Sequence, residues 1–247
     1  MSSPQPTEGD ATPEAAAPLI ELTSITKTYG RGDSAFQALR GVDLRVHHGE
    51  FVAVMGPSGS GKSTVMNILG CLDVPTSGAY VFRGVHVETL SRNQRALLRR
   101  HFLGFVFQGF NLLARTTALE NVELPLLYRG EAATTRHAAA RAALASVGLE
   151  GWEDHTAVEL SGGQQQRVAI ARAIVTKPTL LLADEPTGNL DTQCSREIMN
   201  LLTTLNREQG ISILMVTHDA NMATFARRRV HFVDGRIQSI DHSDDVQ

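Results

Sequence analysis

The stretch GPSGSGKST, from Gly56 to Thr64, follows the continuous apolar run FVAVM and precedes the segment VMNILGCL. It fits the pattern G-x-x-x-x-G-K-[ST], in which glycines let successive backbone N–H groups converge on phosphate oxygens and the next helix adds its positive N-terminal end. In this pattern Lys62 reaches the β- and γ-phosphates, and Ser63 offers a hydroxyl ligand to Mg²⁺. The stretch therefore predicts a nucleotide site at the end of a buried strand. The residues expected to contact the nucleotide here are Gly56, Pro57, Ser58, Gly59, Ser60, Gly61, Lys62, Ser63 and Thr64.

A second apolar run, LLLADEP at Leu180 to Pro186, ends in two adjacent carboxylates. Asp184 is expected to hold Mg²⁺ through its water shell, because this hard cation prefers oxygen ligands. Successive side chains of a strand point in opposite directions, so the neighbouring carboxylate should have a different role. Glu185 is expected to orient and deprotonate the attacking water as a general base. The sequence has no N-K-x-D tetrapeptide, which argues against a GTPase.

The hydrophobic pattern predicts an α/β fold with two kinds of strand. FVAVM, TLLLAD and ISILMV are continuous apolar runs, as expected for parallel strands that are buried on both faces. LIELTSITKTYG, GVDLRVHHGE and GAYVFRG alternate or are short, and they predict an N-terminal antiparallel β-layer. A helix is expected over 195–209 with Gly210 as its stop, and Asp234-Gly235 predicts a hairpin. Residues from about 93 to 159 are expected to form a helical subdomain inserted into the core.

Composition and charge are those of an ordinary globular protein. The 247 residues are 42% hydrophobic and 20% charged, with a formal net charge of -3, so nothing demands a nucleic acid partner. The two cysteines, Cys71 and Cys194, lie outside any metal-ligand spacing. No apolar run is long enough for a transmembrane helix, so a role at a membrane would require docking. Residues 1–18 have no Leu, Ile, Val or Phe and are expected to be disordered, and 241–247 are expected to form a flexible tail.

The segment LSGGQQQR, from Leu160 to Arg167, has the features of a second anion site. Ser161 fits the N-cap of a helix and Gln164 its third position, which is the S-x-x-Q capping-box spacing. A capped structural helix would have the same pattern, so the segment alone does not decide. Other isolated polar residues accompany it, and a small-molecule kinase would not need them. They are Gln108 after FVF, His218 after ILMVT, and Asp191 at the end of TGNLD.

In their order and spacing these segments resemble the ATPase subunit of an ATP-binding cassette (ABC) transporter, over residues 19–240. GPSGSGKST matches the Walker A motif of that family, LLLADEP its Walker B motif and LSGGQ its signature. Gln108 matches its Q-loop, TGNLD its D-loop and His218 its H-loop. The resemblance implies a RecA-like P-loop NTPase core, ATP and Mg²⁺ as cofactors, and ATP hydrolysis coupled to transport.

The resemblance also implies roles for single residues. Glu185 would be the general base, Lys62 would stabilise the transferring phosphoryl group, and His218 would contact the γ-phosphate. Tyr29, near the first strand, would stack on the nucleotide base. The residues at the metal would be Ser63, Gln108 and Asp184.

Partners follow from the resemblance as well. Two subunits of this family bind head to tail, so that each signature helix covers the ATP held by the other subunit. The expected partners are a second copy of the chain and an integral membrane permease bound through the helical subdomain and the Q-loop region, with no nucleic acid. The expected location is cytoplasmic, at the cytoplasmic face of the inner membrane. The residues expected to touch the ATP of the partner subunit are Ser161, Gly162, Gly163, Gln164 and Asp191.

Three segments narrow the branch of the family. LGCLDVPTSGAYVFRG, FVFQGFNLLARTTALENVELPLLYRG and ADEPTGNLD resemble the macrolide-export and lipoprotein-release branch, whose members often drive a separately encoded permease. One alternative is a member of the same branch that regulates a membrane partner in cell-envelope remodelling. A second alternative is a soluble cassette ATPase of DNA repair or translation. Proteins of that class usually have paired cassettes, long coiled coils or basic tails, and the sequence shows none of these.

Overall fold

The three continuous apolar runs form the centre of a six-stranded sheet, and the computed structural model describes residues 17–242. Its strands are β3 (Phe51–Met55), β6 (Leu103–Phe107), β7 (Leu180–Asp184), β8 (Ser212–Val216), β9 (Arg228–Val233) and β10 (Arg236–His242). Their order is β10-β9-β3-β8-β7-β6. All neighbours are parallel except β10, which pairs with β9 in the antiparallel direction. The parallel core predicted from the sequence is confirmed.

Burial on both faces explains why these runs lack polar alternation. In β3, Val52 and Val54 belong to one hydrophobic core, whereas Phe51 and Ala53 belong to the other. The strands β7 and β8 divide their side chains between the two cores in the same way. A parallel strand with a core on each side needs apolar residues at every position.

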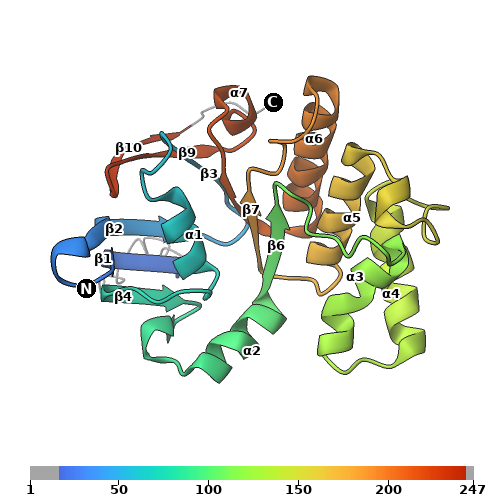
Figure 1. Ribbon diagram of the computed structural model, residues 1–247, viewed down its shortest axis with the longest axis horizontal. Helices are drawn as coiled ribbons and strands as arrows, with labels where there is room; N and C mark the ends of the chain where they lie inside the picture. Colours follow the sequence, from blue (N-terminus) through green and yellow to red (C-terminus); the bar gives the residue numbers. More distant parts are fainter. Residues whose placement is uncertain (1–16, 243–247) are drawn as a thin grey trace, which may run out of the picture.

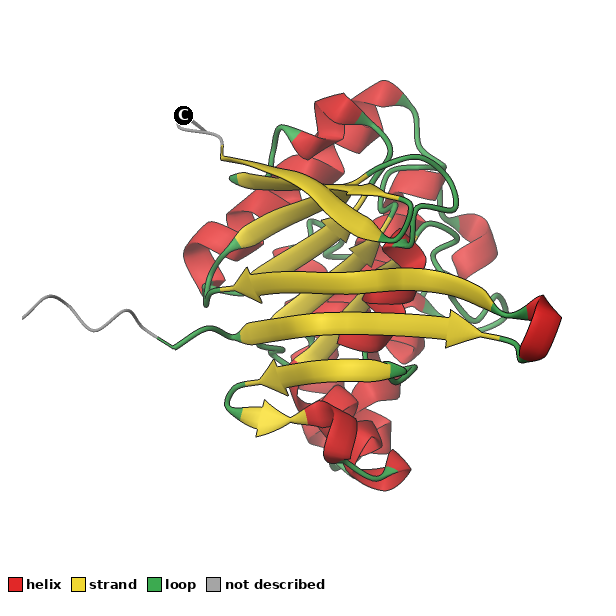
Figure 2. Cartoon of the chain, turned by 90° about the vertical axis from the view of Figure 1, so that its left-hand side faces the viewer, coloured by secondary structure: helices red, strands yellow, loops and turns green. Residues whose placement is uncertain are grey.

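An antiparallel sheet covers one side of the molecule, in the order β2-β1-β4-β5. Its strands are β1 (Ile20–Tyr29), β2 (Phe36–Val46), β4 (Ser77–Phe82) and β5 (Val85–His86). Figure 2 shows these strands in front of the parallel sheet. Ile20, Leu22 and Ile25 of β1 are buried, and the exposed Ser24, with a φ of +50°, lies where the register shifts. The predicted antiparallel layer is confirmed.

Helix α1 (Lys62–Leu69) lies between the two sheets (Figure 1). Val65, Ile68 and Leu69 are fully buried in the core that joins the antiparallel sheet to the parallel one. Because α1 is held from both sides, its first turn is fixed relative to the ends of the parallel strands.

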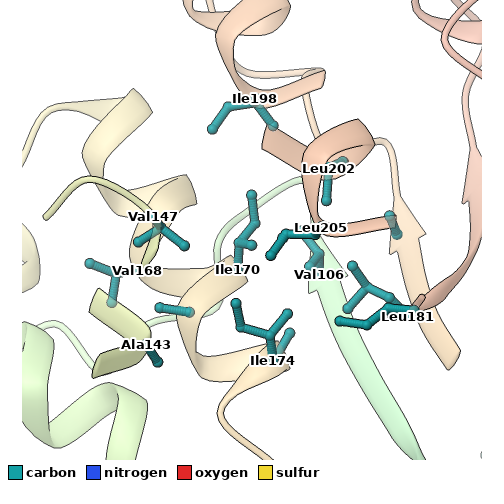
Figure 3. Packing of buried hydrophobic residues seen from close by; sticks show 14 of the residues in the cluster. Val106, Ala143, Val147, Val168, Ile170, Ile174, Leu181, Ile198, Leu202 and Leu205 are labelled. Carbon is teal, nitrogen blue, oxygen red and sulfur yellow. The ribbon is translucent and has the colours of Figure 1, made fainter. Parts of the chain in front are cut away.

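The opposite face of the parallel sheet is covered by α5 (Gly162–Ile174) and α6 (Thr192–Gln209). Gly210 ends α6 with a left-handed φ of +66°, as predicted from the sequence. Figure 3 shows the packing of this second core between sheet and helices. Its labelled residues include Val106 and Leu181 from strands, and Ile170, Ile174, Ile198, Leu202 and Leu205 from the two helices.

The remaining helices complete the covering of the sheets. They are α2 (Arg92–Phe102), α3 (Ala118–Tyr128), α4 (Ala133–Ser146) and α7 (Ala220–Ala223), with short 3-10 helices at Gly32–Ser34, Val87–Thr89 and Ala157–Glu159. The helices α3 and α4 pack on each other and on α5, on the side away from the antiparallel sheet (Figure 1). Within residues 17–242, no helix combines the length and the apolar character that crossing a membrane requires.

Two expected boundaries need correction. The span from about 93 to 159 is not wholly an inserted helical subdomain, because LGFVF forms β6 and pairs in parallel with β7 of the core sheet. The helical insertion therefore starts after β6. The expected flexible tail over 241–247 is wrong at its start, because Asp241 and His242 pair with β9 as the end of β10. Residues 1–16 and 243–247, which hold most of both predicted tails, lie outside the described part of the chain.

Candidate nucleotide-binding site

The loop between β3 and α1 has a backbone that only glycine can follow closely. Gly56 has a φ of +145°, and a Cβ there would lie 2.1 Å from the carbonyl oxygen of Phe232. Gly61 is the N-cap of α1 with a φ of +104°, and no side chain caps the first turn of that helix. The first N–H groups of α1 thus remain available to an anion, and the helix dipole favours negative charge at the same place.

The Lys62 side chain is buried against this loop. Its Nζ donates to the carbonyl oxygens of Gly56 and Pro57, each at 2.8 Å. The lysine is 8% exposed, so its charge is concentrated at the inner wall of the adjoining cavity. This cavity has a volume of about 570 Å³, within the usual size range of ligand sites.

The cavity collects most of the predicted residues. Its wall comprises Gly56, Pro57, Ser58, Gly59, Gly61, Lys62, Ser63 and Thr64 of the loop, Asp184, Glu185 and His218 from the ends of β7 and β8, and Phe36, Ala38 and Val216. Ser60 is buried and does not line the cavity. These residues come together because the carboxyl ends of neighbouring parallel strands lie at one edge of the sheet.

Asp184 and Ser63 fit a Mg²⁺ ion by their chemistry. Burial raises the pKa of Asp184, the neighbouring Glu185 raises it further, and Lys62 lowers it in part. A carboxylate in such surroundings gains from a bound cation. No cluster of three or more His, Cys, Asp or Glu side chains suited to a metal occurs in residues 17–242. This does not conflict with Mg²⁺, which usually takes one or two carboxylates together with substrate phosphates and water.

Glu185 and His218 form a pair across the strand ends. Oε1 of Glu185 lies 2.9 Å from Nδ1 of His218. The backbone N–H of Glu185 donates to the carbonyl oxygen of Val216 at 2.9 Å, which fixes the turn after β7 to the end of β8. Glu185 has a φ of +46°, a left-handed conformation that costs a non-glycine residue about 1–2 kcal/mol. Strain of this kind at a cavity wall is typical of functional residues.

Gln108 lies outside the cavity wall, although the sequence predicts it at the metal. It follows β6, and its Nε2 donates to Oδ1 of Asn189 at 3.2 Å. In return, Nδ2 of Asn189 donates to the carbonyl oxygen of Gln108 at 3.0 Å. In this structure Gln108 is therefore tied to the TGNLD segment and not to Ser63 or Asp184.

The signature residues form a separate polar site at the start of α5. Oγ of Ser161 accepts from the N–H of Gln164 at 3.3 Å, and Oε1 of Gln164 accepts from the N–H of Ser161 at 2.9 Å. The predicted capping box is confirmed. Asp191 caps α6 in a similar way, with Oδ1 accepting from the N–H of Cys194 at 2.9 Å. A Cβ at Gly163 would lie 3.3 Å from Sγ of Cys194, so the starts of α5 and α6 are adjacent.

None of the five signature and D-loop residues contributes to the wall of the cavity beside α1. The starts of α5 and α6 are adjacent, and Ser161 to Gln164 and Asp191 lie away from the cavity wall that contains Lys62. Their contact with the phosphate held by a second copy stays a prediction.

Two residues that line or support the site are not predicted from the sequence. Phe36 is 58% exposed and lines the cavity, and it is the register partner of Tyr29 in the β1–β2 pair. Its only sequence signal is a large apolar residue just after the polar loop GRGDSA. Gln166 is fully buried in α5, and its Nε2 donates to the carbonyl oxygen of Pro186 at 2.7 Å. Only the tertiary structure shows that it supports the turn that carries Glu185.

Tyr29 lies beside this cavity and does not line it. It is 40% exposed at the end of β1, and its hydroxyl donates to Oδ2 of Asp73 at 2.9 Å. Phe36 is thus the aromatic residue in the cavity wall, with Tyr29 next to it on the neighbouring strand.

A second cavity, of about 520 Å³, lies between α2, β6, α3 and α5. We call it the helical groove; its wall includes Arg99, Phe107, Leu124, Tyr128 and Arg172. Both guanidinium NH groups of Arg172 donate to the segment after Gln108, to the carbonyl oxygens of Asn111 at 2.6 Å and Phe110 at 2.8 Å. Of the other leucines in this region, Leu119 and Leu126 are core, Leu112 packs against the core, and Leu113 and Leu127 are exposed.

A family model described as "ABC transporter" matches residues 39–188, which is more than half of the chain and includes the loop before α1, Gln108, the signature and Glu185. The chain belongs to the ABC transporter family. As an ATP-binding cassette of that family it is an ATPase that binds ATP.

Individual relatives agree with this assignment. The chain is 53% identical to the macrolide export ATP-binding/permease protein MacB of Marinobacter nauticus over 220 residues, which cover 89% of the chain and 34% of that protein. It is 50% identical to the pyoverdine export ATP-binding/permease protein PvdT of Pseudomonas syringae pv. syringae, over 93% of the chain and 35% of that protein. The chain therefore spans about a third of the length of these relatives.

A solved ABC cassette has the same fold. The ATP-binding cassette MJ0796, determined as a dimer in a post-hydrolysis state bound to ADP and Pi, superposes with a TM-score of 0.83 at 44% identity. The match covers 90% of this chain and 98% of that one. The predicted P-loop fold and the membership in the macrolide-export branch are confirmed.

Proposed function

We propose that two copies of this ABC cassette form a head-to-tail dimer that hydrolyses ATP at two shared sites and drives an integral membrane permease of the export type. The observation that carries the proposal is the separation of the two phosphate sites in one chain. Ser161 and its neighbours lie outside the wall of the cavity that contains Lys62 and Glu185. A head-to-tail dimer would place the signature helix of one copy over the cavity of the other.

Within each shared site, the residues of the chain have distinct tasks. Lys62 and the N–H groups of the loop stabilise the charge that develops on the transferring phosphoryl group. Glu185 accepts the proton of the attacking water, and the 2.9 Å contact with His218 orients its carboxylate. His218 is also available to the γ-phosphate, because most of its side chain is exposed at the cavity.

The metal and the base complete the proposed site. Ser63 and Asp184 would hold Mg²⁺, which neutralises phosphate charge when bound. Gln108 would join them only if its contacts with Asn189 opened. Tyr29 and Phe36 present aromatic rings beside the cavity and would hold the nucleotide base.

The proposed docking site for the permease is the helical groove. Leu124 and Tyr128 line it, and Tyr128 is 69% exposed, so an apolar helix of the permease would bury them. Arg172 connects this groove to the segment after Gln108. Groove occupancy can therefore act on the segment after Gln108 through a single half-buried side chain. The dimer would work at the cytoplasmic face of the membrane, where such a permease presents its soluble loops.

A mixing experiment tests the dimer. Lys62→Ala disables the loop of one copy, and Ser161→Arg disables the signature of the other, so each variant alone should be inactive. In a head-to-tail dimer, one site of every mixed pair combines an intact loop with an intact signature. Mixing equal amounts should restore up to about a quarter of wild-type hydrolysis, because half of the randomly formed dimers are mixed and have one good site of two. A mixture as inactive as its components would show that Ser161 acts within its own chain.

A further inference from the structure

A partly buried ion pair lies next to Tyr29. Nζ of Lys27 donates to Oδ1 of Asp73 at 2.6 Å and to the carbonyl oxygen of Val74 at 2.7 Å. Lys27 is only 8% exposed, although it lies near the end of β1. A buried ammonium needs such partners, because an unpaired charge in this position would be costly.

Both members of this pair also contact the tyrosine. The Tyr29 hydroxyl donates to Oδ2 of Asp73 at 2.9 Å, so the carboxylate uses one oxygen for each partner. Nζ of Lys27 lies 4.9 Å from the centroid of the Tyr29 ring, within the range of a cation–π interaction. Because Lys27 is buried and Tyr29 is 40% exposed, the ring has its cation on the inner side and an accessible surface outward. The ring orientation is therefore fixed in advance.

Asp73 connects the tyrosine to the helix that begins at the phosphate loop. The N–H of Asp73 donates to the carbonyl oxygen of Asn67 at 3.2 Å, in the last turn of α1. Burial raises the pKa of Asp73, but hydrogen bonds from Lys27, from the N–H of Val74 and from Tyr29 outweigh it and lower the pKa overall. The carboxylate is thus charged at neutral pH. Asp73 therefore joins β1 and the ring through its side chain and α1 through its backbone N–H.

We propose that Lys27 and Asp73 are positioning residues that hold the Tyr29 ring for stacking on the nucleotide base, at a fixed distance from the loop that binds the phosphates. The inference rests on the proposed role of Tyr29 at the base. A pre-oriented ring loses little rotational freedom on binding, so the clamp contributes to affinity without touching the nucleotide.

A purely structural ion pair is the competing explanation, and kinetics distinguish the two. If Asp73 acts through the ring, Asp73→Ala should raise the KM for ATP about threefold to fivefold with kcat within about twofold, and Tyr29→Ala should raise KM about tenfold, as expected for a lost base stack. Asp73→Ala in a Tyr29→Ala background should then add nothing further to KM. Inorganic tripolyphosphate, which has no base, should inhibit all variants with the same Ki as the wild type.

Matched control variants show whether a change in KM is specific to the contact between Asp73 and Tyr29. Glu21→Gln removes an ion pair with the exposed Arg45 on the same sheet and should leave KM unchanged. Asp73→Asn keeps an acceptor for the tyrosine hydroxyl without the charge, and it should give an intermediate KM. It replaces Asp73→Ala in the test if circular dichroism shows that Asp73→Ala folds poorly. The tyrosine hydroxyl alone can be removed with Tyr29→Phe, which should behave like Asp73→Asn.

The possible failures are separable. A further rise of KM in the double variant, or a weaker Ki for tripolyphosphate in Asp73→Ala, would mean that Asp73 supports α1 and not the ring. A normal KM for both Asp73 variants beside a raised KM for Tyr29→Ala would refute the clamp and leave the base stack intact. A normal KM for Tyr29→Ala beside a raised KM for Phe36→Ala would refute the proposed role of Tyr29 itself.

Discussion

Replacing Glu185 with Gln tests the chemistry of the site with the least change in shape. The amide has the size of the carboxylate, and its oxygen can still accept from the ring of His218, whose Nδ1 lies 2.9 Å from Oε1 in the wild type. The left-handed backbone at this position and its hydrogen bond to Val216 do not depend on the charge. The variant should therefore fold normally and lose only the ability to accept a proton.

The expected fall in turnover follows from the proposed role of Glu185 as the general base. Loss of a general base lowers turnover by about 10²- to 10⁴-fold, or about 2.7–5.4 kcal/mol at 1.36 kcal/mol per factor of ten. The nucleotide should bind at least as well as before, because Glu185 is one of the two causes that raise the pKa of Asp184. Removing that negative charge makes Asp184 easier to ionise and a better ligand. The expected pattern is a large fall in kcat with an unchanged or lower Kd for Mg-ATP.

The assay is phosphate release at saturating Mg-ATP, with Kd measured separately by titration and the oligomeric state by size-exclusion chromatography in ATP. Glu208→Gln, an exposed carboxylate on α6, is the control and should match the wild type. Because ATP would no longer be consumed, the variant should accumulate as a dimer. Turnover within tenfold of the wild type would refute the assignment of Glu185 as the base.

Four further substitutions probe other parts of the site. Asp184→Asn should abolish hydrolysis yet raise the Tm of the nucleotide-free protein by about 1–3 °C at pH 7. The folded-state pKa of Asp184 is raised, so the wild type loses stability as pH rises through that pKa and the carboxyl gives up its proton. At low pH the wild-type carboxyl is protonated, and the variant should then have the same Tm as the wild type. Gln166→Leu removes the donor to Pro186 but also a buried oxygen without a partner, so kcat should fall several-fold with little change in the urea midpoint. Gly56→Ala places a Cβ 2.1 Å from a carbonyl oxygen of β9 and should cost about 3 kcal/mol, or a Tm lower by about 6–12 °C. Gly59→Ala, with open space around the Cβ, should cost about 1 kcal/mol in the same melts.

The parts of the fold that the sequence predicts are those with a strong local signal. Continuous apolar runs predict the parallel strands because such strands are buried on both faces. Alternation predicts β1 because only one face of that strand is buried. The strand β6 is also a short apolar run, but it follows directly on α2. No turn residue separates LGFVF from the helical pattern before it, so the sequence predicts a helical span there, and only the pairing with β7 shows a core strand.

The residues of the candidate site also fall into two groups, those that belong to a sequence motif and those that do not. The loop before α1, the two carboxylates and His218 belong to short motifs, and a motif fixes both residue type and position. Phe36, Lys27 and Asp73 belong to no motif. They meet the site through a strand pairing and through the turn that ends α1, and these contacts exist only in three dimensions. Gln108 shows the reverse case, since its motif is evident but its side chain bonds to Asn189 in this structure.

The separation of the two phosphate sites has a further consequence within one chain, through α5. This helix begins at the signature, and its buried Gln166 donates to the carbonyl oxygen of the residue after Glu185. The same turn is held on its other side by Val216 and His218 of the neighbouring strand end. Glu185 is therefore positioned jointly by its own sheet and by the helix proposed to cover the partner's ATP. A displacement of α5 would act on a carboxylate whose backbone is already strained, because the hydrogen bond from Gln166 is short and buried. The geometry that separates the sites thus also gives each of them a mechanical connection to the other.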